Sequence, residues 1–278
     1  MLAMELWFTE NQTSDLRLSF RVKQLLYHRK SAYQEILVVD TYEYGRLLAL
    51  DGAIQLTEKD EFTYHEMITH VPLYAHPLPE SVLIIGGGDG GAVREVVKHR
   101  EVKSVEMVEI DEEVINVSKR YFPSVSSGLK DKRVSIKIED GMAYVKGKKK
   151  RYDVIIVDST DPVEIAKVLF EKPFYRNVFY ALKDDGIFVA QTESPFCKLD
   201  VLKSAYNGIK AVFDRVWVYW GVMPTYPSGM WTYTIGSKRY DVSSPIRECD
   251  VSTRYYTPEV HRSAFVLPPF LKEWISTV

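Results

Sequence analysis

Four acidic residues stand at the ends of predicted β-strands, and together their carboxylates could bind a ribose, a cation or an amine. They are Asp89 in a glycine loop after strand 82–85, Glu109 ending strand 104–109, Asp140 after strand 134–138 and Asp158 after strand 153–157. In an open parallel sheet, the carboxyl ends of the strands face one crevice. A crevice that collects carboxylates attracts positive groups and repels bare phosphates.

Asp158 and Asp161 are the strongest catalytic candidates. They lie three residues apart on a loop that follows a strand, so both carboxylates can converge on one bound cation. Crowding and partial desolvation raise the pKa of one member of such a pair, which makes it a useful base. An Asx turn before Pro162 would explain Asp161 but not Asp158.

The glycine loop, residues 86–91 (GGGDGG), connects an apolar run to a helical stretch, 92–99. Although glycine loops also form plain turns, strand, glycine turn and helix begin a nucleotide-binding α/β unit, where helix N–H groups point at the ligand. Asp89 inside the loop would repel a pyrophosphate. The loop therefore disfavours NAD and ATP and favours a ligand with a cationic group.

Glu109 follows Gly86 by 23 residues, near the expected position of an acid that binds ribose hydroxyls. Alternatively, Glu109 and Asp111 only cap the helix that begins at Glu112; we favour ribose binding for Glu109. Asp140, followed by a glycine, could be only a turn residue. Its position beside the same crevice favours contact with an adenine edge.

Three aromatic residues, Tyr64, His65 and Tyr226, are candidates for the pocket wall. Aromatic faces favour a cationic substrate. Ordinary core packing is the alternative for each of them, and His65 could be a histidine whose hydrogen bonds are satisfied inside the protein.

The fold class follows from strands that alternate with helices. The predicted strands are 82–85, 104–109, 134–138, 153–157 and 187–192, and the predicted helices are 92–99, 112–121, 173–182 and 199–213. This alternation predicts right-handed crossovers and a parallel sheet. No helix fits between the last two strands, 216–222 and 230–235, which predicts an antiparallel hairpin. We expect an α/β, Rossmann-like sheet of the methyltransferase type that ends in this hairpin.

The region before the glycine loop predicts a small β domain, 1–58, ahead of a catalytic domain, 59–278. Its strand candidates are 34–41, 46–50 and 53–57, with turns between them. A helical pattern over 59–70 follows, and Pro72 is expected to close that helix.

Composition narrows the function classes. The chain has 278 residues, 46% of them hydrophobic, and a net charge of −2, so nucleic acid is not an expected partner. Two cysteines, Cys197 and Cys249, lack metal-ligand spacing and fit a reduced compartment. The N-terminus has no signal-like region, and no run approaches the roughly 18 apolar residues that a membrane span needs. We expect a soluble, cytoplasmic protein.

The chain resembles the spermidine synthases, members of the polyamine aminopropyltransferase family. The matching stretches, in family order, are 47–73, 82–99, 108–115, 152–162, 224–231 and 255–268. The resemblance implies an N-terminal β domain used in oligomer contacts, in a homodimer or homotetramer. It also implies decarboxylated S-adenosylmethionine as the aminopropyl donor, a primary di- or polyamine as acceptor (putrescine by default), and no metal.

The resemblance also implies residue roles. Asp158 resembles the general base, with Tyr64 and Asp161 as the other catalytic residues. The residues that resemble donor-binding positions are Gln34, Asp89, Glu109, Asp140 and Gly141, with Asp89 on the aminopropyl ammonium. Those that resemble amine-site positions are Tyr64, His65, Asp161 and Tyr226, with Trp7 and Glu193 at the distal end of the amine.

One departure from the family pattern is visible after Val163, where Glu164-Ile165 replaces the usual Gly-Pro. Glycine and proline fix the backbone of this loop, which borders the adenine and the amine channel in the family. The added charge of Glu164 predicts a preference for a longer or more cationic amine.

Other functions compete with this interpretation. An S-adenosylmethionine-dependent methyltransferase would share the fold, the glycine loop and the ribose acid. A non-catalytic amine-binding or scaffold protein is a further class, because a fold alone does not fix a function. A nicotinamide dehydrogenase is disfavoured by Asp89.

Overall fold

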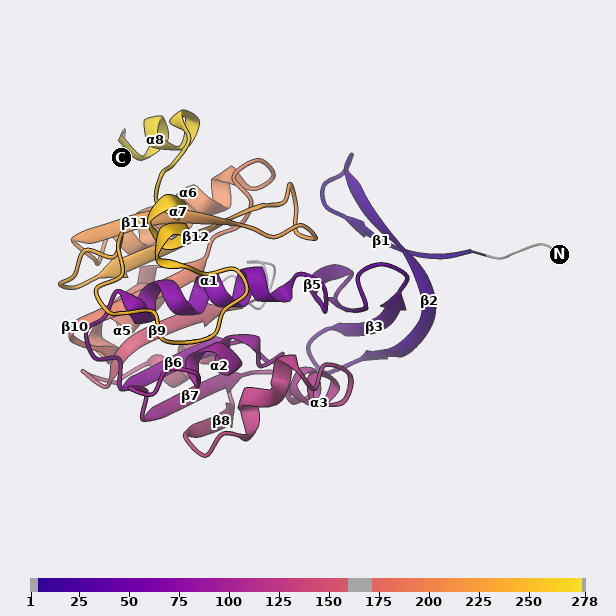
Figure 1. Cartoon of the computed structure of the whole chain (residues 1–278), viewed down its shortest axis with the longest axis horizontal. Helices are drawn as coiled ribbons and strands as arrows, with labels where there is room; N and C mark the ends of the chain where they lie inside the picture. The colour runs from indigo at the N-terminus through magenta and orange to yellow at the C-terminus, as the bar shows by residue number, and fades with distance from the viewer. Residues whose placement is uncertain (1–4, 160–171, 277–278) are drawn as a thin grey trace.

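The computed structural model describes residues 5–159 and 172–276, which form two β-sheets (Figure 1). The smaller sheet is antiparallel, with its strands in chain order: β1 (Leu6–Asn11), β2 (Arg17–Lys30), β3 (Glu35–Thr41), β4 (Arg46–Leu50) and β5 (Ala53–Thr57). Sequence analysis found β3 to β5 and missed β1 and β2. Within the 14 residues of β2 only Phe20 and Val22 are buried. The short alternation of Leu18, Phe20 and Val22 was overlooked, and the polar residues after it gave no strand pattern.

The larger sheet has seven strands in the order β11-β12-β10-β9-β6-β7-β8. Their bounds are β6 (Ser81–Gly86), β7 (Ser104–Glu109), β8 (Val134–Ile138), β9 (Tyr152–Asp158), β10 (Leu182–Gln191), β11 (Arg215–Val222) and β12 (Met230–Ser237). Strands β6 to β10 pair in parallel, whereas β12 is antiparallel to both β10 and β11. The predicted parallel sheet with a terminal antiparallel hairpin is confirmed.

Helices surround the larger sheet (Figure 1). They are α1 (Glu61–Tyr74), α2 (Gly91–Val96), α3 (Glu112–Tyr121), α4 (Gly141–Val145), α5 (Lys172–Ala181), α6 (Leu199–Lys210), α7 (Pro258–Ala264) and α8 (Pro269–Ser276), with a 3₁₀ helix at Val125–Lys130. None of the helices in the described ranges is long and apolar enough to cross a membrane.

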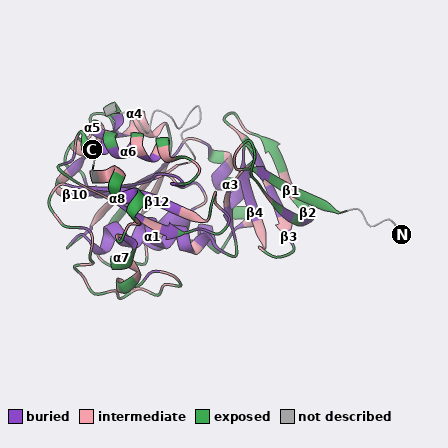
Figure 2. Cartoon of the chain, turned by 90° about the horizontal axis from the view of Figure 1, so that it is seen from above, coloured by how far each residue is buried: buried purple, intermediate pink, exposed green. Residues whose placement is uncertain are grey.

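The prediction that Pro72 closes the first helix was wrong, because α1 contains Pro72 and ends at Tyr74. Burial explains the difference: almost every side chain of α1 is removed from water, and this packing outweighs the one backbone hydrogen bond that a proline removes. In Figure 2 the helix and the sheet beneath it are coloured as buried, in contrast to the exposed stretches of β1 and β2.

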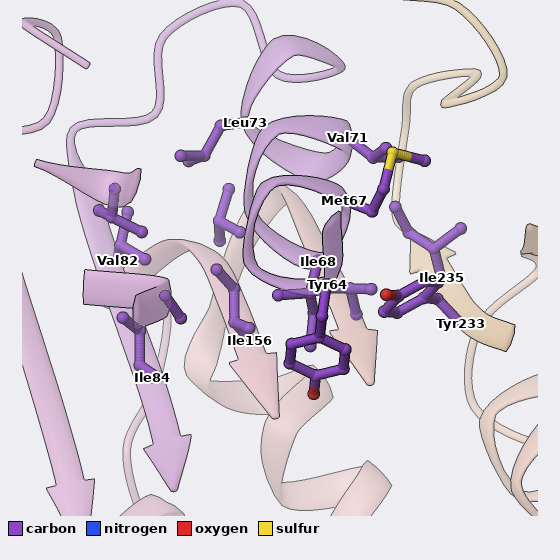
Figure 3. Close-up of a cluster of buried hydrophobic side chains, with 14 of the residues drawn as sticks. Tyr64, Met67, Ile68, Val71, Leu73, Val82, Ile84, Ile156, Tyr233 and Ile235 are labelled. Carbon is purple, nitrogen blue, oxygen red and sulfur yellow. The ribbon is translucent and has the colours of Figure 1, made fainter. Parts of the chain in front are cut away.

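Helix α1 links the hydrophobic core to the carboxyl ends of the strands. Ile68 and its neighbours pack on Ile84 of β6 and Ile156 of β9, and Tyr233 of β12 covers the other side (Figure 3). Tyr64, one turn before Ile68, points its hydroxyl toward the carboxyl ends of the strands. The apolar core therefore fixes the position of a polar group at the crevice.

Candidate active site

A cavity of about 560 Å³ lies at the carboxyl ends of β6, β7 and β9. The N-terminal sheet forms its opposite wall through residues of β1, β4 and β5. The lining includes eight of the twelve site residues singled out from the sequence: Gln34, Tyr64, Asp89, Glu109, Asp140, Gly141, Asp158 and Tyr226. The crevice inferred from strand ends is therefore a partly open cavity whose lining includes several carboxylates.

The glycine loop folds onto the end of β9. The Gly87 N–H donates to the backbone carbonyl of Asp158 at 2.7 Å, and Gly86 has φ +83°. A Cβ on Gly86 would lie 2.2 Å from that carbonyl oxygen. Only glycine accepts both the positive φ and the close contact.

Gly86→Ala is expected to destabilise the protein by more than the roughly 1–3 kcal/mol that a strained φ alone costs, because the new methyl group also overlaps the Asp158 carbonyl. Gly147→Ala is the matched control, since Gly147 has φ +78° but a Cβ added there would meet no described atom within 4 Å. Urea unfolding measures both variants. Equal losses of stability would show that the contact with Asp158 carries no cost.

Asp158 is half-buried and oriented by Tyr64, whose hydroxyl donates to its Oδ1 at 2.7 Å. Burial, followed by the negative charge of Asp89, raises the pKa of Asp158 to about 6. Burial also raises the pKa of Tyr64 well above 10, so the phenol keeps its proton and stays a donor. Within the described part of the chain, Oδ2 of Asp158 has no hydrogen-bond partner. These features suit a base whose second oxygen faces a ligand.

Two candidates that belong beside Asp158 lie outside the described residues. They are Asp161, predicted as its catalytic partner, and Glu164 of the loop that departs from the family pattern. Both assignments stay predictions.

Three side chains meet at the ribose position predicted for Glu109. Glu109 is buried, which raises its pKa to about 7, and its Oε1 accepts the Asp111 N–H at 3.0 Å. Asp111 caps α3 by accepting the Glu113 N–H, and its other oxygen accepts the amide of Gln34 at 3.0 Å. Each of the two interpretations of this segment therefore applies to one residue. Asp111 caps the helix, whereas Glu109 lines the cavity.

Asp140 combines both roles proposed for it. It is the N-cap of α4, with Oδ1 accepting the Ala143 N–H at 2.7 Å, and together with Gly141 it also lines the cavity. One oxygen therefore holds the turn while the side chain remains at the cavity wall.

Tyr226 joins the β11–β12 connection to the N-terminal sheet. Its hydroxyl donates to the Gln55 carbonyl at 2.6 Å, and its ring lies 5.6 Å from that of Tyr64. Two aromatic faces thus border the cavity beside Asp158.

Three predicted residues are not among the described residues that line the cavity: His65, Trp7 and Glu193. His65 is buried behind Asp89, with its Nε2 3.3 Å from Asp89 Oδ1. Glu193 is buried just after β10 in the left-handed region, with φ 72°. Trp7 is half-exposed on β1, and its indole donates to Glu5.

Glu10 lines the cavity and was missed by sequence analysis. It lies on β1, and its Oε1 accepts the Ile54 N–H at 3.0 Å. Side chains alternate between the two faces of a strand, so Glu10 and Trp7, three residues apart, point in opposite directions. Recognition of β1 as a strand would have revealed an acid on its inner face.

The sheet order and the cavity at its strand ends define a Rossmann-like protein of the methyltransferase type. Comparison with known proteins is more specific. The family model of the spermine/spermidine synthase domain matches residues 61–245, and that of the spermidine synthase tetramerisation domain matches residues 6–58.

Curated relatives match over their whole length. The polyamine aminopropyltransferase of Caldicellulosiruptor bescii is 50% identical over 281 residues, covering 99% of this chain and 100% of the relative. That of Thermoanaerobacter pseudethanolicus is 51% identical over 276 residues, covering 97% and 98%. The chain therefore belongs to the spermine/spermidine synthase family, and its activity class is that of the polyamine aminopropyltransferases.

Solved structures agree with this assignment. A spermidine synthase in complex with the transition state analogue AdoDATO has a TM-score of 0.94 at 42% identity, covering 98% of this chain and 96% of that one. The spermidine synthase of Thermotoga maritima has a TM-score of 0.92 at 41% identity, covering 98% and 95%.

Proposed function

We propose that this protein transfers the aminopropyl group of decarboxylated S-adenosylmethionine to a primary di- or polyamine, putrescine by default, which gives spermidine and methylthioadenosine. The observation that carries the proposal is the hydrogen-bonded Tyr64–Asp158 pair at the wall of a cavity lined by carboxylates. The AdoDATO complex of a solved relative supports the choice of donor.

Asp158 acts as the general base. A primary amine has a pKa of roughly 10.4 and enters as an ammonium ion, which cannot attack until it loses a proton. Asp158 accepts that proton, and Tyr64 holds the carboxylate in place. The freed nitrogen attacks the carbon beside the sulfonium; the C–N bond forms as the C–S bond breaks, and its electron pair leaves on sulfur as neutral methylthioadenosine.

The donor lies along the strand ends. Asp89 holds the aminopropyl ammonium, Glu109 the ribose hydroxyls and Asp140 the adenine edge, with Gln34 and Gly141 beside them. Asp89 also selects the donor: intact S-adenosylmethionine would place its own carboxylate near this anion, and the two would repel.

The acceptor lies between the two domains. Tyr64 and Tyr226 face the aliphatic and cationic parts of the amine, and Glu10, on the wall formed by the N-terminal sheet, attracts its distal ammonium. Asp161, Glu193 and Trp7 keep the amine-site roles that the resemblance implies. Among them, Trp7 would need to move or to act from another subunit, because it points away from this cavity.

The rate should depend on pH through Asp158. Because its pKa is raised to about 6, Asp158 is an active carboxylate above that pH and a protonated, inactive acid below it. At saturating donor, kcat/KM for the amine should fall about tenfold per unit once the pH drops below about 6. In Tyr64→Phe this fall in kcat/KM, the acid limb of the profile, should begin at higher pH. The hydrogen bond from Tyr64 lowers the pKa of Asp158, and the variant lacks that hydrogen bond. A profile that stays flat to pH 5 would remove Asp158 as the base.

The direct test of the function is a panel of amines incubated with decarboxylated S-adenosylmethionine. Release of methylthioadenosine with putrescine, cadaverine, agmatine or a longer polyamine identifies the acceptor. Mass spectrometry of the product separates aminopropyl transfer from methyl transfer. No release with any amine would contradict the proposal and favour a binding protein.

We further propose that the protein works in the cytoplasm as a homodimer or homotetramer. The match of residues 6–58 to the tetramerisation domain supports the oligomer, and the two free cysteines fit a reducing compartment. Light scattering coupled to size-exclusion chromatography decides between two and four subunits.

A further inference from the structure

A buried chain of charged groups extends from the cavity into the protein. Asp89 lies 3.3 Å from Nε2 of His65, and Nδ1 of His65 lies 2.6 Å from Glu61 Oε2. Arg94 of α2 then donates to both oxygens of Glu61, at 2.9 and 2.8 Å. Glu61 and His65 are only 5% and 1% exposed, so water hardly reaches the contact between these two side chains.

The geometry defines the protonation of His65. Nδ1 of His65 makes a hydrogen bond with Glu61 and Nε2 lies 3.3 Å from Asp89, and an ionised carboxylate only accepts hydrogen bonds, so this geometry favours a proton on both nitrogens. The bidentate contact with Arg94 keeps Glu61 ionised in turn. The imidazole is therefore a cation held between two anions.

The imidazole of His65 packs directly against the backbone of Gly91 at the end of the glycine loop. A Cβ on Gly91, the first residue of α2, would lie 2.2 Å from Cε1 of His65 and 2.4 Å from each ring nitrogen. The Gly91 N–H also donates to Asp89 Oδ1 at 2.6 Å. The same glycine thus makes room for the imidazole and orients the carboxylate that the imidazole faces.

We propose that Glu61, held by Arg94, is a positioning residue that presents His65 as a cation to Asp89 and so gives the two site carboxylates different roles. The inference rests on the functions proposed for Asp89 and Asp158. Asp89 stays a permanent anion for the donor, and Asp158 is left as the carboxylate that gains and loses the proton.

The pKa directions agree with this division. Burial favours neutral groups, yet the charges of Asp89 and Glu61 raise the pKa of His65 well above 6.5. Against the same effect of burial, His65 lowers the pKa of Asp89. Burial and the charge of Asp89 raise the pKa of Asp158, and the positive charge of His65 offsets only part of this increase. Buried carboxylates whose pKa values are pushed apart in this way take separate parts in a reaction.

The titratable and charged groups around His65 come from four segments. Glu61 and the phenol of Tyr64 lie on α1, Asp89 on the glycine loop, Arg94 on α2, and Asp158 at the end of β9. Glu95 of α2 bonds Arg94 at 2.7 Å and His70 at 3.0 Å, and within the described ranges it makes no ion pair with His65. Glu95 is as buried as Glu61 and belongs to the same network, which makes it the matched control.

The first test is nuclear magnetic resonance of the wild-type protein labelled with ¹⁵N-histidine, with the His65 signals identified by their loss in His65→Gln. Both ring nitrogens should stay protonated above pH 7. In Glu61→Gln the titration should move to lower pH by about one unit or more, whereas Glu95→Gln should leave it unchanged. A neutral His65 at pH 7 in the wild type would overturn the proposal, even if Glu61→Gln failed to fold.

The second test is the pH profile of kcat/KM for the amine. In Glu61→Gln the acid limb should move to higher pH to the extent that His65 loses its proton in that range, because the positive charge of His65 lowers the pKa of Asp158. Glu95→Gln should keep the wild-type limb. Equal limbs in both variants would show that Glu61 is only structural. The resonance experiment needs no turnover, so it decides the charge of His65 even if the proposed reaction is wrong.

Discussion

Asp158→Asn is expected to lower kcat by about 10²- to 10⁴-fold, the usual contribution of a general base. Asparagine has nearly the same shape, and its carbonyl oxygen can still accept the Tyr64 hydroxyl, so the cavity should keep its form. What the variant loses is the ability to take the proton from the ammonium ion of the acceptor. Methylthioadenosine release at saturating substrates measures the loss.

Donor binding should survive this change, because Asp158 acts on the amine. The affinity for decarboxylated S-adenosylmethionine, measured by calorimetry, should stay within about threefold of the wild type. Asp153→Asn is the matched control: Asp153 is a buried acid at the start of the same strand, at the end opposite Asp158, where it accepts the Ser81 N–H and binds Lys183. That control should lower stability and keep kcat, and a wild-type kcat in Asp158→Asn would contradict the assignment.

Sequence patterns predicted the elements whose signals are local. The strand Val134–Ile138 and the helix Glu112–Tyr121 have the predicted bounds, the latter because Asp111 supplies a strong N-cap. Acids at strand ends were found for the same reason: apolar runs mark where strands stop, and parallel pairing brings their ends together. This logic located the cavity.

What the sequence could not show depends on contacts between distant segments. The helix containing Pro72 continues because the sheet and the C-terminal strands bury it, and β1 escaped detection because only one of its residues, Glu10, is buried. Trp7 was assigned to the amine site from the family resemblance alone, and Glu10 was not considered. A pattern of residue types cannot tell which face of an unrecognised strand points inward.

The role of His65 could be predicted only in part from the sequence. Its position next to Tyr64 suggested contact with the amine, yet an i, i+4 contact with Glu61 and a contact with Asp89 occupy both sides of its ring. The helical spacing was visible in the sequence. The approach of Asp89, 24 residues away along the chain, required the fold.

Asp89→Asn is expected to weaken binding of the donor on the order of 10- to 100-fold, because the ammonium ion loses a charged hydrogen-bond partner. The preference for the decarboxylated donor over intact S-adenosylmethionine should also shrink, since the repelling anion is gone. Calorimetric titration of the variant with each donor gives both affinities. Asp140→Asn is the control, and it should weaken both donors alike because Asp140 lies at the cavity wall beside Gly141, in the position proposed for the adenine edge.

The same variant changes the pH profile in a direction that no loss of stability can imitate. The charge of Asp89 raises the pKa of Asp158, so its removal should move the acid limb of kcat/KM to lower pH. Glu61→Gln should move that limb the opposite way, although both variants remove one negative charge from the same buried chain. The signs differ because Asp89 acts on Asp158 directly, whereas Glu61 acts through the cation it holds. An unchanged ratio of donor affinities in Asp89→Asn, together with limbs that move in the same direction, would leave the carboxylates of this site without separate roles.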